Sequence, residues 1–528
     1  MLLVSYEFLG FLALLVLLYY LIPGKMQWCL LLAASYLFYA VSGWKTVGFI
    51  LVTTVSVWWL GLKIGRMHAD CSAYIKSHEL SKDEKKQYRA KVKKIQWRWL
   101  LAGLFLNFGI LAVLKYTNFA LENVNGLLHL FGSSASLGFV NWLMPLGVSY
   151  YTFQSAGYLI DVYRKKYEPE QNIGHMALFV SFFPQLIQGP ISRFDEMKEQ
   201  YFKPHVFQWN QVCLGMQRML WGYFKKLIIA DRLLSVILTI SQDMETYRGI
   251  YVWIGMICYT IQIYADFAGG IDIVIGAAQM LGIRLPENFD RPYFSKTVPE
   301  YWRRWHMSLM LWLREYIFYP SSICGPVNRL TKSAKKHLGD GVAKRVPVYS
   351  ASIIVWLVVG IWHGATWGYV IWGMIHCAIL LASQEFAPVK RAFHQKYDVE
   401  GKTWFQIIQI VRTLFILSLV QMLEYYHTVP NMLSMQWNMF TASAFGQLFD
   451  GRMADLGLTG ADWIVVFAGV LVMLFVSLLQ RRGSVRGQIA ARPFWQQAMV
   501  WYVLLTVVLI FGAYGQGYDA SQFIYNQF

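Results

Sequence analysis

The sequence predicts an all-α polytopic membrane protein, and three observations lead to that fold class. Of the 528 residues, 56% are hydrophobic and only 15% are charged, a balance that a soluble chain of this length does not need. Long apolar runs recur from one end of the chain to the other. Lys and Arg are concentrated in particular segments between these runs. Because lipid offers no hydrogen-bond partners to a peptide backbone, the apolar runs are expected to cross a bilayer as helices.

The clearest apolar runs are expected to be membrane-spanning helices, and a weaker run is interrupted by Arg412. In chain order the runs are 8–22, 47–62, 100–114, 407–423 (the weaker one), 463–479 and 499–511. Less regular apolar segments lie between them, and no soluble domain or linker separates them. We therefore expect one domain over residues 1–528 with an even number of crossings, about ten to twelve, plus re-entrant and interfacial helices.

The distribution of charge predicts the topology. The formal net charge of +17 would suggest nucleic acid in a soluble protein, but here the basic residues gather between apolar runs, so no nucleic-acid partner is expected and the lipid bilayer is. By the positive-inside rule the Lys/Arg-rich segments are cytoplasmic and the segments without Lys or Arg lie outside. The basic segments are 66–98, 164–166, 329–345, 390–402 and 481–492; the segments without Lys or Arg include 121–142 and 515–528. Both termini are then extracytoplasmic, and the first run, which lacks a cleavage motif, is a retained span.

Three segments of the middle third depart from simple hydropathy. Residues 179–190 are apolar but contain two prolines and two glutamines, which indicates a broken helix lining a protein-walled cavity. Residues 208–228 mix aromatic side chains with three basic ones and are typical of an interfacial amphipathic helix. Residues 251–283 contain Gly269 and Gly270, where we expect a kink or a break. Asp266 and Asp272, in the same segment, are interpreted as paired structural carboxylates.

Residues 297–319, TVPEYWRRWHMSLMLWLREYIFY, begin with a helix signature. Thr297 is the expected N-cap, Pro299 lies in the first turn and Glu300 stands three residues after the cap. Aromatic and leucine side chains then recur at spacings of three and four, which predicts one amphipathic helix with an aromatic stripe. His306 lies just off that stripe, beside Arg303, and is a candidate either for chemistry or for a contact with a lipid headgroup.

A second histidine, His363, is set among tryptophans and glycines in VVGIWHGATWGYVIWG (358–373). Counted from Arg345, a helix would carry this side chain about 27 Å, most of the way across a bilayer. A neutral imidazole there can take a proton from an alcohol, and nearby glycines would let backbone approach a ligand. The alternative is a hydrogen-bonded anchor at a helix end. The other nine histidines, His376 among them, are interpreted as bystanders, and the six scattered cysteines predict neither disulfides nor a metal site.

The chain resembles the membrane-bound O-acyltransferase (MBOAT) family, and within it a bacterial branch similar to alginate O-acetyltransferase and related to teichoic-acid D-alanyl transfer. The resemblance rests on WRRWHMSLMLWLREYIFY (302–319) followed by WHGATW (362–367). Supporting stretches are YYTFQSAGYLIDVYR (150–164), FFPQLIQGPISR (182–193), LGIRLPENFDRPY (281–293) and FIYNQF (523–528). All but the last fall within a signature region of about 140–385.

The resemblance implies a ring of helices around a central funnel or tunnel that donor and acceptor enter from opposite sides. It implies that His363 is the general base and His306 its auxiliary partner. Such enzymes pass an acetyl group from a cytoplasmic thioester to a hydroxyl outside, often with a secreted SGNH-type partner that completes modification of a polysaccharide. The location implied is the bacterial cytoplasmic membrane, and the segment after Tyr319 differs from that of alginate enzymes, so the acceptor polymer stays open.

The donor expected is acetyl-CoA, a substrate rather than a permanently bound cofactor, and no metal is expected. From charge alone, its phosphates are assigned to Arg303, Arg304, Lys335 and Lys336. Two alternatives remain open: D-alanyl transfer from a carrier protein to a cell-wall polymer, and a proton-coupled transporter without acyl chemistry.

Overall fold

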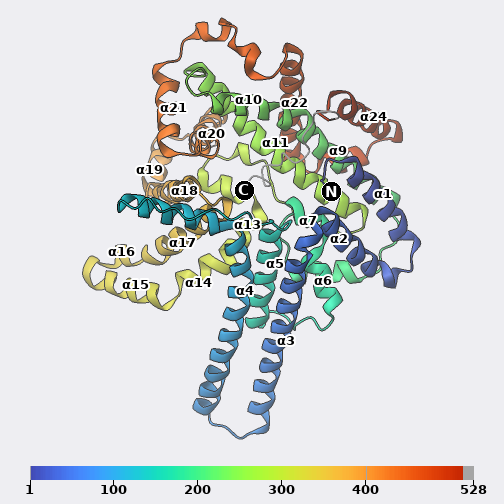
Figure 1. The fold of residues 1–528 in the computed structure, drawn as a ribbon, viewed down its shortest axis with the longest axis vertical. Helices are drawn as coiled ribbons and strands as arrows, with labels where there is room; N and C mark the ends of the chain where they lie inside the picture. Colours follow the sequence, from blue (N-terminus) through green and yellow to red (C-terminus); the bar gives the residue numbers. More distant parts are fainter. Residues whose placement is uncertain (1, 400, 515–528) are drawn as a thin grey trace. The chain divides into compact units, whose positions relative to one another are not determined.

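The computed structural model describes residues 2–399 and 401–514. In this part of the chain helices are joined by loops (Figure 1). The one isolated β-bridge pairs Phe289 with Trp305. The terminal FIYNQF stretch at 523–528 lies outside the described residues. The chain forms two compact units, Met1–Val212 with Ala277–Leu285, and Cys213–Gly276 with Pro286–Phe528. The single domain expected over residues 1–528 stays a prediction.

The fold class predicted from composition is confirmed. Eight segments of the described chain are helical, long and apolar enough to cross a membrane: Gly24–Ser77, Lys82–Leu130, Ile250–Met280, Asp340–His363, Trp367–Glu385, Thr403–Tyr426, Gly460–Arg482 and Phe494–Phe511. The first of them contains two long helices divided by a short 3₁₀ turn, and Tyr6–Leu21 is a shorter apolar helix. Each apolar run named from the sequence lies in one of these helices.

The first unit holds the N-terminal helices. They are α1 (Tyr6–Leu21), α2 (Gln27–Gly43), α3 (Val47–Ser77), α4 (Lys82–Leu130), α5 (Val148–Tyr163), α6 (Ile173–Ser181), α7 (Phe183–Gln188), α8 (Phe194–Phe202) and the start of α9 (Trp209–Tyr223); 3₁₀ turns η1 (Gly24–Met26) and η2 (Trp44–Thr46) flank α2. The end of α11 belongs to the same unit.

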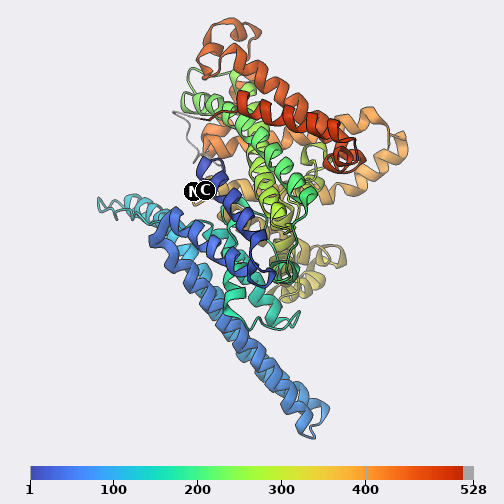
Figure 2. The same cartoon turned by 90° about the vertical axis from the view of Figure 1, so that its right-hand side faces the viewer.

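A long antiparallel pair, α3 and α4, dominates the first unit (Figures 1 and 2). The turn between them is closed by a capping box in which Ser81 accepts a hydrogen bond from the Glu84 backbone and Glu84 accepts one from the Ser81 backbone. With 49 residues, α4 is roughly 74 Å long, which exceeds the thickness of a bilayer with its headgroups. The basic residues of 66–98 lie toward this turn, so they extend beyond the apolar part of the hairpin.

The break predicted within residues 179–190 is confirmed. Helix α6 ends at Ser181 and α7 begins at Phe183, with Pro184 in the first turn of α7, where a missing backbone N–H is tolerated. Every residue from 179 to 190 is buried. The segment is therefore surrounded by protein, as irregular backbone in a membrane protein must be.

The second unit holds the remaining helices. They are α10 (Asp231–Gln242), α11 (Ile250–Met280), α12 (Val298–Arg304), α13 (Met307–Leu313), α14 (Tyr319–Ser322), α15 (Gly325–Leu338), α16 (Asp340–Ala343), α17 (Val346–His363), α18 (Trp367–Glu385), α19 (Ala387–Tyr397), α20 (Thr403–Tyr426), α21 (Val429–Thr441), α22 (Gly460–Leu479), α23 (Val485–Ala490) and α24 (Phe494–Phe511). Two π-helical segments, η3 (Phe224–Ala230) and η5 (Arg314–Phe318), continue α9 and α13, and 3₁₀ turns are η4 (Pro292–Phe294), η6 (Phe445–Phe449), η7 (Arg452–Leu456) and η8 (Gln480–Arg482).

The interfacial helix expected at 208–228 is wrong in its second half. Helix α9 runs into η3, and there Lys225 and Lys226 are buried rather than turned to a membrane surface. Lys226 forms ion pairs with Asp231, at 2.7 Å, and with Asp266. These carboxylates compensate for the burial of the ammonium group. We call these three residues the Lys226 cluster.

A second, partly buried set of charges is adjacent. Arg218 donates from Nε to Asp272 Oδ1 at 2.8 Å and also pairs with Glu287, while Lys225 donates to the other oxygen of Asp272 at 2.6 Å. Asp266 and Asp272 are thus paired, as the sequence predicted.

The break expected as one alternative at Gly269 and Gly270 is wrong, because α11 is helical from Ile250 to Met280 without interruption, and the kink stays a prediction. Gly222, on α9, explains why small residues are needed here. A Cβ atom on Gly222 would lie 2.6 Å from the carbonyl oxygen of Gly269, so these glycines bring two helix backbones together. The role that the structure shows for them is close packing.

The single helix expected over residues 297–319 is divided at His306. The N-terminal signature is confirmed, since Thr297 caps Glu300 and the Glu300 carboxylate accepts from the Lys296 backbone. Helix α12 then ends at Arg304, and His306 adopts a left-handed conformation with φ of 47° before α13 begins. The isolated β-bridge between Phe289 and Trp305 holds the chain extended at this break.

Candidate active site

A tight hairpin of α17 and α18 positions His363. Helix α17 ends at His363, and the chain turns within three residues to begin α18 at Trp367. A Cβ atom on Gly364 would lie 2.1 Å from the Tyr369 ring, and one on Gly373 would lie 2.5 Å from the Trp356 carbonyl oxygen. The glycines of this motif therefore let the two helices meet, whereas the sequence interpretation had them facing a ligand.

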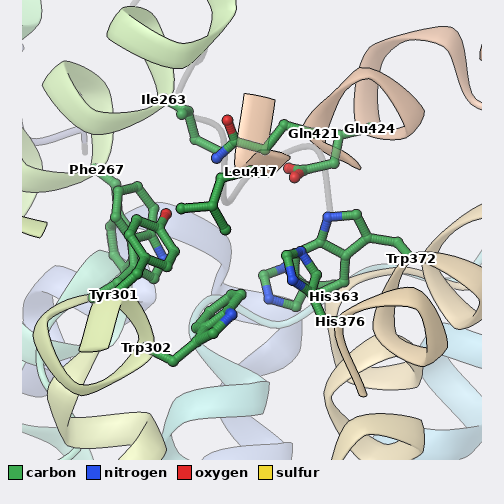
Figure 3. Close-up of a pocket in the computed structure, with 11 residues that line it drawn as sticks. Ile263, Phe267, Tyr301, Trp302, His363, Trp372, His376, Leu417, Gln421 and Glu424 are labelled. Atoms are coloured by element: carbon green, nitrogen blue, oxygen red, sulfur yellow. The ribbon is translucent and has the colours of Figure 1, made fainter. Parts of the chain in front are cut away.

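His363 lines a small cavity of about 20 Å³, which has room for about one water molecule (Figure 3). The eleven lining residues are Ile263, Phe267, Tyr301, Trp302, Trp305, His363, Trp372, His376, Leu417, Gln421 and Glu424. They come from α11, from the segment around α12, from the α17–α18 hairpin and from α20. The cavity is walled mainly by aromatic rings, so charge that develops inside it is shielded from bulk water.

Three aromatic rings fix the orientation of the His363 imidazole. Its ring centroid lies 5.0 Å from that of Trp362, 4.8 Å from that of Trp372 and 6.2 Å from that of Tyr369. Trp362 and Trp372 are buried, whereas His363 is only half-buried. A histidine held in this way can exchange a proton with a molecule in the cavity, which is the geometric requirement for a general base.

His306 stands behind the cavity rather than on its lining, as far as the described residues define it. Its Nδ1 lies 3.2 Å from Asn288 Oδ1, which also accepts hydrogen bonds from the backbone N–H and the hydroxyl of Ser308. Because the Ser308 backbone can only donate, the Asn288 atom is an acceptor, and His306 must carry its proton on Nδ1. Nε2 is then the nitrogen able to accept a proton.

Burial determines the charge of His306, which lies outside the candidate spans. The pKa of His306 is lowered from 6.5 to about 3 because burial disfavours the charged imidazolium, a shift that a backbone hydrogen bond opposes only weakly. The ring stands 5.8 Å from the Trp362 ring, which in turn is 5.0 Å from His363. Trp362 thus lies between the two histidines that the sequence proposed for chemistry.

The four basic residues assigned to donor phosphates do not lie together around one cavity. Arg303 lines a second, larger cavity of about 490 Å³ whose walls are mostly apolar. This cavity shares the Trp302 indole with the His363 cavity. Arg304 pairs with Glu300 at 2.7 Å, and Lys335 pairs with Asp340 at 3.2 Å. Within the described chain, Arg304, Lys335 and the exposed Lys336 line neither cavity.

Three polar residues of the cavity were not proposed from the sequence. His376 was interpreted as a bystander, and Gln421 and Glu424 lie at the end of α20, the weakest of the predicted spans. Glu424 is buried and accepts a hydrogen bond from the Tyr259 hydroxyl at 2.9 Å. The available signal was the one carboxylate of a predicted span, which in a membrane protein indicates a functional position by default.

Buried ionisable side chains around a cavity inside a multi-pass helical protein indicate a functional site within the membrane, as in membrane-embedded enzymes and transporters. The family model described as MBOAT, membrane-bound O-acyltransferase family, matches residues 169–334, which contain His306 but not His363.

Relatives extend the match over most of the chain. The probable alginate O-acetylase of Azotobacter vinelandii is 32% identical over 440 residues, 83% of this chain and 76% of the relative. The probable alginate O-acetylase of Pseudomonas aeruginosa is 31% identical over 467 residues, 88% of this chain and 78% of the relative. The peptidoglycan O-acetyltransferase of Helicobacter pylori is 31% identical over 322 residues, 56% of this chain and 57% of the relative. The protein belongs to the membrane-bound O-acyltransferase family.

Proposed function

We propose that this O-acyltransferase moves an acetyl group from acetyl-CoA on the cytoplasmic side to a hydroxyl group on the other side of the membrane. The reaction contributes to O-acetylation of an exopolysaccharide or cell-wall polymer. The observation that carries this proposal is His363 on the wall of a cavity lined by aromatic rings. The activities for which the relatives are named, alginate and peptidoglycan O-acetylation, support an acetyl group and a polymeric acceptor.

The chemistry assigned to His363 is general base catalysis. The imidazole takes the proton of the acceptor hydroxyl as its oxygen attacks the thioester carbonyl, so that the new C–O bond forms. Collapse of the resulting intermediate breaks the C–S bond, and the leaving thiolate receives the proton from His363. The products are an ester and CoA with a free thiol. The aromatic walls exclude water, which would otherwise compete as the acceptor.

The route assigned to the donor is the larger apolar cavity. It adjoins the His363 cavity at Trp302, and Arg303 on its wall supplies positive charge for the donor phosphates. Movement of the Trp302 indole would join the two cavities and admit the acetyl end of the donor. His306, held by Asn288, is assigned a supporting role behind the cavity wall.

The setting proposed follows from the charge pattern and the relatives. The protein is placed in a bacterial cytoplasmic membrane with both termini outside, so that donor and acceptor come from opposite sides. A secreted SGNH-type acyltransferase is the proposed partner that completes transfer to the polymer.

The test is acetyl transfer in proteoliposomes with radiolabelled acetyl-CoA. His363→Ala is expected to lower transfer by about 10²- to 10⁴-fold, the usual contribution of a general base, while melting temperature in detergent stays unchanged. His129→Ala, which removes an exposed histidine of α4, is the matched control and should retain full activity.

Three outcomes would contradict the proposal. Near-normal transfer by folded His363→Ala would remove the assigned base. Transfer that requires an acylated carrier protein and ignores acetyl-CoA would establish the D-alanyl alternative. Passage of a donor or sugar across the liposome without any ester formation would establish a transporter.

A further inference from the structure

Among the two histidines and the glutamate that line the His363 cavity, His376 on α18 is the most deeply buried. It is 1% exposed, and it lines the same cavity as His363 (Figure 3). Among the described residues, neither of its ring nitrogens has a hydrogen-bond partner. Buried polar groups in folded proteins are almost always paired, so an imidazole in this position needs an explanation.

Three tryptophan rings surround His376 and form an aromatic cage. Its ring centroid lies 4.6 Å from Trp372, 5.0 Å from Trp302 and 5.4 Å from Trp356, the last stacked. A phenylalanine would fill such a cage without burying two unsatisfied nitrogens. The packing of α18 therefore does not account for a histidine here.

His376 also shares its principal neighbour with His363. The Trp372 indole lies 4.8 Å from the His363 ring and 4.6 Å from the His376 ring, so both imidazoles border the same small space. Glu424 and Gln421, the other polar residues of the cavity, already have protein contacts, with Tyr259 and Thr260. Both ring nitrogens of His376 thus remain available to a bound molecule, as does the Trp302 indole N–H.

We propose that His376 is a second catalytic residue, whose ring N–H donates a hydrogen bond to the carbonyl oxygen of the acyl thioester. This inference rests on the proposed function and deepens it. A neutral imidazole carries one N–H donor, and a donor fixed in a cavity closed to water stabilises an oxyanion more strongly than water can. The cavity of about 20 Å³ has room for one small group, such as that oxygen, between the two rings.

The roles of the two histidines differ in the reaction. His363 takes the hydroxyl proton while the acceptor oxygen bonds to the carbonyl carbon, and the carbonyl π electrons move to its oxygen. His376 holds that oxyanion through its N–H and keeps its own proton throughout. When the C–O double bond re-forms, the C–S bond breaks and the thiolate takes the proton from His363.

His376→Phe separates packing from chemistry, because the ring is retained and the nitrogens are lost. In proteoliposomes we expect kcat to fall about 10²- to 10³-fold, the usual effect of removing one oxyanion donor, with KM for acetyl-CoA within about twofold of the wild type. The melting temperature should be equal or higher. Cys377→Ala, at the adjacent buried position of α18, is the matched control and should retain kcat.

Two further variants keep the inference falsifiable if the phenylalanine disturbs folding. His376→Gln and His376→Asn carry an N–H donor near the positions of Nε2 and Nδ1, and we expect one of them to recover at least about tenfold of the lost kcat. Wild-type kcat in His376→Phe would overturn the inference. So would a loss of kcat in all three variants that follows their melting temperatures, because that result indicates a structural role.

The outcomes also distinguish this inference from the proposed function. If the wild-type protein forms no ester from acetyl-CoA, the proposed function fails. If the wild type is active and His363→Ala is inactive but His376→Phe is fully active, only the role of His376 fails.

Discussion

The Lys226 cluster and the His363 cavity both bury polar side chains in the second unit, but they do so in opposite ways. In the Lys226 cluster a fully buried ammonium is paired with two carboxylates, so its charge is compensated within the protein. In the cavity, two histidines, a glutamine and a glutamate share aromatic walls, and the nitrogens of His376 are not balanced by any described residue. Paired buried charges hold helices together, whereas buried polar atoms left to a cavity are available for a substrate.

The largest effect that tests this comparison is expected from removal of the buried cation, Lys226. Lys226→Met leaves two carboxylates without their cation, and we expect the free energy of unfolding to fall by about 3–5 kcal/mol. Unfolding in mixed micelles with rising denaturing detergent measures the change. Lys335→Gln is the control, because the Lys335–Asp340 pair is exposed and contributes at most about 1 kcal/mol. Equal effects of the two substitutions would mean that the Lys226 cluster has no special structural role.

A second test concerns the support of His306. Asn288→Ala removes the acceptor shared by His306 and Ser308, leaving buried donors unsatisfied, and should lower the free energy of unfolding by about 1–3 kcal/mol. The same measurement applies, combined with the acetyl-transfer assay. Asn328→Ala, on the exposed face of α15, is a control expected to change neither quantity appreciably. A stable and fully active Asn288→Ala protein would remove His306 from the supporting role given to it.

The smallest effect expected is a pH dependence of stability due to His306. Its pKa is lowered by burial from 6.5 to about 3, so the folded protein resists a proton that the unfolded chain accepts below pH 6.5. The contribution of His306 to the free energy of unfolding is therefore complete above pH 6.5 and decreases as the pH drops toward 3. The decrease is roughly 1.4 kcal/mol over the first pH unit below 6.5. Melting temperatures at pH 7.5 and 5.5 should show the loss, and His306→Gln should reduce it. An identical loss in His306→Gln would assign the acid sensitivity to other groups.

The sequence predicted what depends on local pattern. The helical class, the cap at Thr297, the break before Pro184 and the pairing of Asp266 and Asp272 all follow from residue type and short-range spacing, and the structure has each of them. Both candidate histidines belong to the second unit, His306 at the break before α13 and His363 at the end of α17, and of the two only His363 lines the cavity.

What the sequence missed depends on contacts between distant segments. The helix break at His306 requires Asn288 and Phe289, which approach it only in the folded chain. The glycines at 269 and 270 suggested a kink because their partner on α9 is invisible in the local sequence. His376 stands thirteen positions after His363, and only the α17–α18 hairpin brings the two to one cavity. The spacing of residues within one helix does not predict which residues of two helices will line the same cavity.

The α3–α4 hairpin provides a site at which the orientation of the protein in the membrane can be measured. Its turn, residues 78–81, is fastened by the Ser81–Glu84 box at the end of two uninterrupted helices, well removed along the chain from the apolar stretch of α4. A protease recognition sequence inserted there would be cleaved only by protease added to the compartment that contains it. Cleavage in inverted vesicles but not in intact spheroplasts would report directly which way the molecule was inserted, without altering any residue of the second unit.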